Sequence, residues 1–288
     1  MKPPPFSYHD PATVPEAVGL LSRLENAKLL AGGQSLMPML NFRFVLPDHL
    51  IDLNRVEGLD FIREGGGGIE IGAMTRQRGV EFSEPVKRHC PLLSEAILHV
   101  GHRQTRNWGT FGGSLAHLDP SAEIPLVCAA LDAIVSVEGP DGGRDIAFAD
   151  FPAGYMMPAM GLDEVLISAR IPAWGPTHGH GFEEFARRHG DFAIVSAAAL
   201  LETGSDGRIA RASLTVGGLG AAPVRVSAGE AALIGEAGSD EVFRAAAEEA
   251  RKIDAIGDVH APASYRQHLA AVLIRRALEK AWARIKAG

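Results

Sequence analysis

The sequence predicts an α+β fold, in which antiparallel strands and short helices precede a mainly helical C-terminal segment. Two observations predict the antiparallel sheet: pairs of apolar, strand-length runs flank glycine-rich turns at 65–68 and at 139–143. A third is the helical spacing of apolar residues from 227 onward. With 288 residues, the chain is long enough for two domains.

The N-terminal segment alternates helical and strand patterns, which predicts a small βαβ-like unit. Residues 13–16, Thr-Val-Pro-Glu, form a capping box at the start of a helix that has its proline in the first turn. An apolar stripe at Val18, Leu20, Leu21 and Leu24 predicts the buried face of that helix. Strands are expected at 28–31 and 49–53, with a turn or two of helix within 36–44.

The middle of the chain predicts an antiparallel sheet with helices. One hairpin is expected from strands at 61–63 and 69–71, and another from strands at 133–137 and 144–148. Residues 75–82 and 92–100 have helical patterns, and 165–171 is a further apolar strand.

A segment rich in proline, glycine and histidine, 172–180, predicts the boundary between two domains. We therefore divide the chain into 1–176, with halves of about 1–57 and 58–176, and 177–288. The second part is expected to contain strands at 181–187, 193–202 and 208–216. Helices are expected at 227–234, 239–253 and 264–286, the last with a capping box at 264–267.

Composition excludes several classes of protein. The net charge of -7 offers no basic field for nucleic acid. No apolar stretch approaches the ~20 residues that span a bilayer, and the N-terminus lacks a secretory signal. Cys90 and Cys128 are isolated, which predicts buried free thiols in a reducing cytoplasm and no zinc or iron–sulfur site in this chain.

Two glycine-serine turns carry the chemical information: Ala-Gly-Gly-Gln-Ser at 31–35 and Thr-Phe-Gly-Gly-Ser at 110–114. Paired glycines let backbone N–H groups approach a phosphate closely, so two such turns favour the pyrophosphate of a dinucleotide. Neither turn matches the P-loop or the Rossmann fingerprint, because the lysine and the alternating glycines are absent. Two tight turns without a ligand are the alternative interpretation.

Three motifs resemble those of the FAD-binding medium subunit of molybdenum hydroxylases, the carbon monoxide dehydrogenase and xanthine dehydrogenase type. They are 31–40 followed by 47–54, then 105–120 (TRNWGTFGGSLAHLDP), then 190–195 (GDFAIV), and the resemblance covers essentially the whole chain. It implies a two-part FAD-binding domain of the vanillyl-alcohol-oxidase type. A C-terminal domain with a small antiparallel sheet and helices would follow.

The resemblance also implies which residues contact FAD. The two turns would wrap the pyrophosphate through backbone N–H groups and hydroxyls, without a side-chain cation. Glu123 would contact the ribityl or ring region, Leu166 would pack on the isoalloxazine, and Phe192 would lie near the ring. The implied set is Leu30, Ala31, Gly32, Gly33, Gln34, Ser35, Leu36, Thr110, Gly112, Gly113, Ser114, His117, Asp119, Glu123, Leu166 and Phe192.

Several of these residues also have an ordinary structural interpretation. His117 is compatible with simple packing, Asp119 with a turn, Glu123 with a helix start, and Leu166 with strand core. Two departures from some relatives concern flavin tuning: Phe192 replaces a tyrosine, and Glu184 stands where a lysine is found.

By resemblance, the chain is an electron-transfer subunit with no catalytic residue for the substrate. A large partner would hold molybdopterin, a small partner would carry two [2Fe–2S] clusters, and a dimer of heterotrimers is the family expectation. Electrons would pass from the clusters to FAD and on to an external acceptor. The alternatives are a stand-alone flavin oxidase of the vanillyl-alcohol-oxidase type and a flavin-free scaffold subunit.

Overall fold

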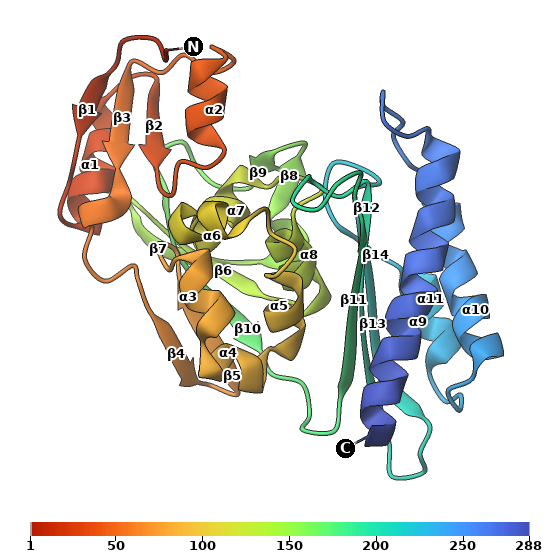
Figure 1. Cartoon of the computed structure of the whole chain (residues 1–288). Coiled ribbons are helices and arrows are strands. Elements are labelled where there is room, and N and C mark those ends of the chain that lie inside the picture. The colour runs from red at the N-terminus through yellow and green to blue at the C-terminus, as the bar shows by residue number, and fades with distance from the viewer. Residues whose placement is uncertain (1, 288) are drawn as a thin grey trace.

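The computed structural model describes residues 2–287 and arranges them around three main sheets (Figure 1). The first sheet is parallel, with strand order β1-β3-β2. Two helices connect its strands, which confirms the predicted βαβ-like unit. Its elements are β1 (Ser7–His9), α1 (Val14–Arg23), β2 (Ala27–Leu30), α2 (Leu36–Asn41), β3 (His49–Asp52) and the 3-10 turn η1 (Leu53–Arg55).

The first helix begins where the sequence predicts. The Thr13 hydroxyl accepts a hydrogen bond from the Glu16 N–H, and the Glu16 carboxylate accepts one from the Thr13 N–H. This capping box satisfies backbone donors that the first helical turn would otherwise leave free. Ala17, Val18 and Leu20 are buried, so the predicted stripe does face the interior.

The middle of the chain forms a five-stranded antiparallel sheet with strand order β4-β5-β10-β6-β7. Both predicted hairpins are present, whereas helices α4, α6 and α7 were not predicted. The elements are β4 (Ile62–Gly65), β5 (Gly68–Gly72), α3 (Gln77–Phe82), α4 (Glu84–His89), α5 (Pro91–Ala96), α6 (Arg103–Trp108), α7 (Phe111–His117), α8 (Glu123–Ala130), β6 (Ile134–Gly139), β7 (Gly142–Ala147), η2 (Phe148–Asp150), β8 (Pro152–Gly154), β9 (Met157–Pro158) and β10 (Val165–Pro172).

The C-terminal part contains a four-stranded antiparallel sheet, β11-β12-β13-β14, with helices packed on it. The long helix α11 lies along β11 and β12, and α10 packs beside it (Figure 1). These elements are β11 (Gly179–Phe185), β12 (Val195–Thr203), β13 (Ile209–Gly217), β14 (Val224–Arg225), α9 (Ser227–Leu233), α10 (Asp240–Glu248), η3 (Glu249–Lys252) and α11 (Ala263–Ala287). The predicted α+β fold class is confirmed.

One predicted helix start is wrong. Helix α11 already includes Ala263, so Ser264 lies inside the helix and cannot be its N-cap. The Gln267 amide donates to the Ile253 carbonyl instead of turning back to the cap, which ties α11 to the segment after η3. Pro262 accepts backbone hydrogen bonds from Tyr265 and Arg266 and so precedes the first turn.

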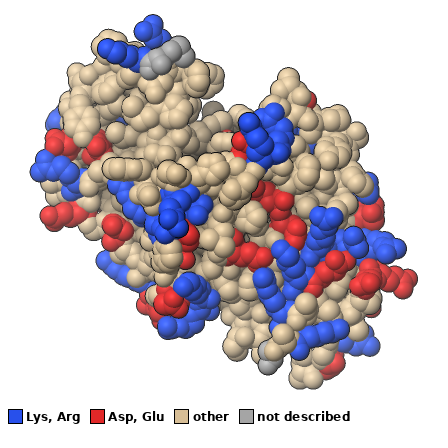
Figure 2. Space-filling view, viewed as in Figure 1, with Lys and Arg blue, Asp and Glu red and all other residues tan. Residues whose placement is uncertain are grey.

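The surface on the α11 side carries intermixed charges, with basic side chains beside acidic ones (Figure 2). Arg275 pairs with Glu279 one turn further along α11, as opposite charges four residues apart on a helix surface do. Lys280 and Arg284 reach farther, because both also contact Glu95 of α5 in the middle of the chain. Ion pairs therefore connect the last helix to the five-stranded unit.

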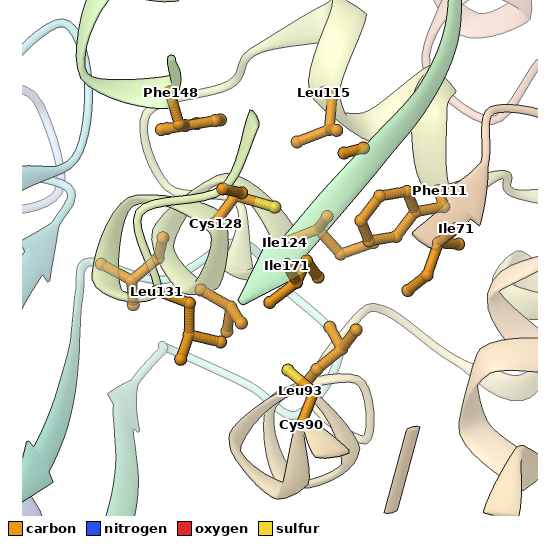
Figure 3. Packing of buried hydrophobic residues seen from close by; sticks show 14 of the residues in the cluster. Ile71, Cys90, Leu93, Phe111, Leu115, Ile124, Cys128, Leu131, Phe148 and Ile171 are labelled. Carbon is orange, nitrogen blue, oxygen red and sulfur yellow. The ribbon is translucent and has the colours of Figure 1, made fainter. Parts of the chain in front are cut away.

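The core of the five-stranded unit determines where the second glycine turn lies (Figure 3). Phe111 and Leu115 of α7 are fully buried and pack with Ile71 of β5 and Ile171 of β10. Burial of a phenylalanine and a leucine is worth about 1.5–3 kcal/mol each. The apolar face of α7 thus holds the turn at its first residues in a fixed place on the sheet.

Candidate cofactor site

The fold brings the two glycine turns into contact. The Gly32 Cα packs on the backbone of Trp108 and Gly109, where a Cβ would lie 2.7 Å from the Gly109 Cα. A Cβ on Gly113 would lie 3.5 Å from the Cβ of Ala31. The approach at Gly32 leaves no room for a Cβ and therefore requires glycine, whereas the distance at Gly113 is an ordinary van der Waals contact between the two turns.

The first turn leaves several backbone donors free. None of the N–H groups of Gly32, Gly33, Gln34 and Ser35 donates to an acceptor within residues 2–287. Gly33 has a φ of +70°, in the left-handed region that glycine adopts at little cost. Successive free N–H groups around such a residue form a concave donor site for an anion, which fits a pyrophosphate.

The second turn differs from its prediction. The N–H groups of Phe111 and Gly112 donate to the carbonyls of Thr75 and Ala73, and those of Gly113 and Ser114 donate to Thr110. These amides are therefore already satisfied. The second turn therefore packs closely against the first turn through its backbone, and the free N–H donors belong to the first turn.

A side-chain cation that belongs to neither turn lies beside them. The guanidinium of Arg76 donates to the Trp108 carbonyl and to Oδ1 of Asn54. The Asn54 amide donates in turn to the Ala31 carbonyl, over 3.1 Å. Arg76 comes from neither motif, so the motifs gave no signal for it. Its bonds link the segment before the second turn to the first turn.

The segment after the second turn contains three more predicted residues. Oδ1 of Asp119 accepts a hydrogen bond from the Ser121 N–H at 2.9 Å, so this residue has the turn role that was its alternative. His117 ends α7 and is half-buried, and burial lowers the pKa of its imidazole. Glu123 is the first residue of α8 and is buried.

The carboxyl of Glu123 lies next to that of Glu184 of β11, near enough for each to shift the other's pKa. Burial raises the pKa of Glu123 to about 7, and burial together with the neighbouring Glu123 charge raises the pKa of Glu184 to about 8. Oε2 of Glu184 is buried and has no hydrogen-bond partner within residues 2–287. The pair is therefore suited to share a proton at neutral pH.

Phe192 and Leu166 lie in different environments. The Phe192 side chain is 58% exposed in the loop between β11 and β12. Leu166 is buried in the core of the five-stranded sheet, beside a bulge in β10. The β11–β12 loop reaches the start of α6, since the Gly190 Cα packs on the His102 ring. His102 and this contact carried no signal in the sequence.

The other predicted residues surround the first turn. Leu30 ends β2 and Leu36 begins α2, both half-buried, and the Gln34 amide donates to the Gly32 carbonyl at 3.1 Å. Thr110 caps α7, as its hydroxyl accepts from the Gly113 N–H. Across residues 2–287, no helix is both long and apolar enough to span a membrane.

Comparisons with known proteins match both parts of the chain. Residues 4–174 match the family model described as FAD binding domain in molybdopterin dehydrogenase, and 180–281 match the CO dehydrogenase flavoprotein C-terminal domain. The alpha subunit of the 6-hydroxypseudooxynicotine dehydrogenase complex of Paenarthrobacter nicotinovorans is 39% identical, over 98% of this chain and 96% of that protein.

Carbon monoxide dehydrogenase gives matches in both sequence and structure. The medium chain from Hydrogenophaga pseudoflava is 37% identical over 99% of each chain. A solved structure of carbon monoxide dehydrogenase from that organism superposes with a TM-score of 0.96, at 39% identity and 99% coverage of both chains.

Proposed function

This chain belongs to the FAD-binding medium subunits of the molybdenum hydroxylase family, and on that premise we propose that it passes electrons from a partner's iron–sulfur clusters to an external acceptor. The observation that carries the proposal is the pair of glycine turns in contact, one with four free backbone N–H groups. Those donors fit the pyrophosphate of FAD, the cofactor of this family.

The residues of the site have distinct roles under this proposal. The amides of Gly32 to Ser35 bind the phosphates, and the second turn, held by Phe111, closes the opposite side. The carboxyl of Glu123 lies where α8 begins and faces the ribityl region, with Glu184 behind it. Exposed Phe192 leaves an approach from solvent for the acceptor. Leu166, His117 and Asp119 remain predicted contacts.

Bound FAD would supply the redox chemistry, because it accepts single electrons and also donates pairs. The protein positions the cofactor and sets its environment. No substrate site is proposed in this chain. A large molybdopterin subunit and a small subunit with two [2Fe–2S] clusters would hold the remaining cofactors, and a dimer of heterotrimers in the cytoplasm is the proposed assembly. The names of the relatives, a complex subunit and a medium chain, support such partners.

The domain division proposed above, 1–176 and 177–288, suits this role. Glu123 lies on the first side of the boundary and Glu184 on the second, so the cofactor site would adjoin both domains.

The test is to purify the chain alone, record its visible spectrum, precipitate it with acid and identify the released cofactor. Free FAD in stoichiometric amount, without turnover of aldehydes or N-heterocycles by the isolated chain, is expected. Colour that stays with the precipitate, together with substrate turnover, would indicate a stand-alone flavin oxidase. A folded, colourless chain that refuses added FAD would indicate a scaffold.

A further inference from the structure

An exposed tryptophan adjoins the place where the two turns meet. Trp108 is the last residue of α6, and its backbone packs on Gly32 of the first turn. Its indole is 62% exposed, which is uncommon for a tryptophan. The Arg76 guanidinium lies 5.8 Å from the centroid of the indole ring. An aromatic ring and a cation thus stand together at the edge of the proposed phosphate site.

The two ends of helix α6 lie near the two ends of the proposed cofactor site. Its N-cap, His102, packs against Gly190 of the loop that contains Phe192, where the flavin ring is proposed to lie. Its last residue, Trp108, adjoins the glycine turn. Six helical residues rise about 9 Å between these ends. A dinucleotide with its flavin ring near His102 and its pyrophosphate at Gly32 would place its adenosine half beside Trp108, whose backbone contacts Gly32.

The chemistry at this edge fits an adenosine. Purine bases stack on indole rings even where no hydrogen bond recognises the base. An arginine next to the indole can contact the face of the stacked rings or pair with a phosphate. Arg76 is already oriented by its bonds to the Trp108 carbonyl and to Asn54. Figure 2 shows a group of basic side chains over the α3–α6 region, the region that contains Arg76.

We propose that Trp108 and Arg76 form the subsite for the adenosine half of FAD, with the adenine stacked on the indole and the guanidinium beside the adjoining phosphate. This inference rests on the proposed function, since it assigns one end of the same cofactor. It makes Trp108 a residue that favours FAD over FMN, which has no adenosine.

The experiment compares FAD, ADP and FMN on the flavin-free chain by isothermal titration calorimetry, for the wild type, Trp108→Leu and Trp108→Phe. Loss of a stacked base is expected to weaken FAD and ADP at least about tenfold in Trp108→Leu. FMN binding should stay unchanged, and Trp108→Phe should restore most of the affinity. Phe82→Leu is the matched control, because Phe82 is also exposed and arginine-stacked, on α3.

The outcomes separate this inference from the proposed function. Equal weakening of FMN and FAD in Trp108→Leu would mean that Trp108 only supports the turn, and unchanged FAD and ADP affinities would mean no adenine contact. Either result overturns the subsite while FAD binding by the wild type stands. A wild-type chain that binds no FAD would overturn the proposed function itself. Circular dichroism confirms that each variant is folded. The rate of FAD loss on dilution of the flavin-loaded chain provides a second readout.

Discussion

The carboxyl of Glu123, at the start of α8, lies next to the carboxyl of Glu184 on β11, in the part of the chain that follows the predicted domain boundary. Both side chains are buried, Glu123 at 4% and Glu184 at 6% exposure. Two adjacent buried carboxylates repel each other, so the pair is stable only while it holds a proton. Asp119 adds to this repulsion at Glu123, Arg106 reduces it, and His99 lies 3.9 Å from Glu184.

Stability should therefore fall as pH rises through the neutral range. The pKa is raised from an ordinary 4.5 to about 7 at Glu123 and to about 8 at Glu184. Between pH 4.5 and about pH 8, the folded chain therefore binds more protons than the unfolded chain. The free energy of unfolding then decreases with pH across that window, by about 1.4 kcal/mol per pH unit for each extra proton. Urea unfolding from pH 5 to 8.5 measures this slope.

Glu184→Gln should flatten that slope and raise stability at pH 8, because an amide can donate to Glu123 without charge. Glu183→Gln is the control: the neighbouring Glu183 pairs with Lys280 at 2.7 Å and does not contact the buried pair. A Glu184→Gln variant with the wild-type slope would show that the pair does not share a proton.

Glu95 should contribute with the opposite sign. Burial alone would raise its pKa, but the hydrogen bond and charge of Arg284 and the charge of Lys280 hold the pKa of this carboxyl below its usual value. Its stabilising effect is present above the unfolded-state pKa and is lost as pH falls. Glu95→Gln should cost about 1.5–3 kcal/mol at pH 7, with a smaller difference below pH 4.5.

The matched control is Glu84→Gln, which removes the exposed Glu84–Lys87 pair and should leave the melting temperature unchanged. If Glu95→Gln behaves like this control, the link between α5 and α11 does not stabilise the fold.

The two cysteines should be unreactive in the folded chain. Cys90 and Cys128 are buried in the core of the five-stranded unit, and burial raises the pKa of the Cys90 thiol to about 12 (Figure 3). Since the thiolate is the reactive form, a thiol reagent such as 5,5′-dithiobis(2-nitrobenzoate) should label neither cysteine natively and both in guanidinium chloride. Rapid native labelling of either residue would contradict the packing of this core.

The sequence was sufficient for elements with strong local patterns. The capping box at Thr13 and Glu16 and the hairpin around 65–68 depend on neighbours within a few residues, and both are confirmed. The helix α6 was not predicted, because its sequence RQTRNW contains a single apolar residue, Trp108, and so shows no apolar periodicity. The capping box at Ser264 was wrong because the helix starts one residue earlier, after Pro262.

In the candidate site too, local motifs could be predicted from the sequence, whereas contacts between distant segments could not. The glycine turns were visible as motifs, but their contact through Gly32 and Trp108 depends on packing between distant segments. The amides of the second turn are satisfied by Ala73 and Thr75, which no motif places nearby. Arg76 and the partner of Glu123 were missed for the same reason, since long-range pairs leave no local pattern.

The flavin content of two matched glycine variants tests the central claim most directly. Gly33 and Gly66 both have positive φ, +70° and +61°, so valine strains the backbone at either position. Gly66 lies in the hairpin between β4 and β5, with no atom near its Cβ position, whereas Gly33 belongs to the turn with free N–H groups. Gly33→Val should fold yet lose FAD during purification, while Gly66→Val keeps a stoichiometric amount. A folded Gly33→Val chain with full FAD content would contradict the assignment of this turn to the pyrophosphate.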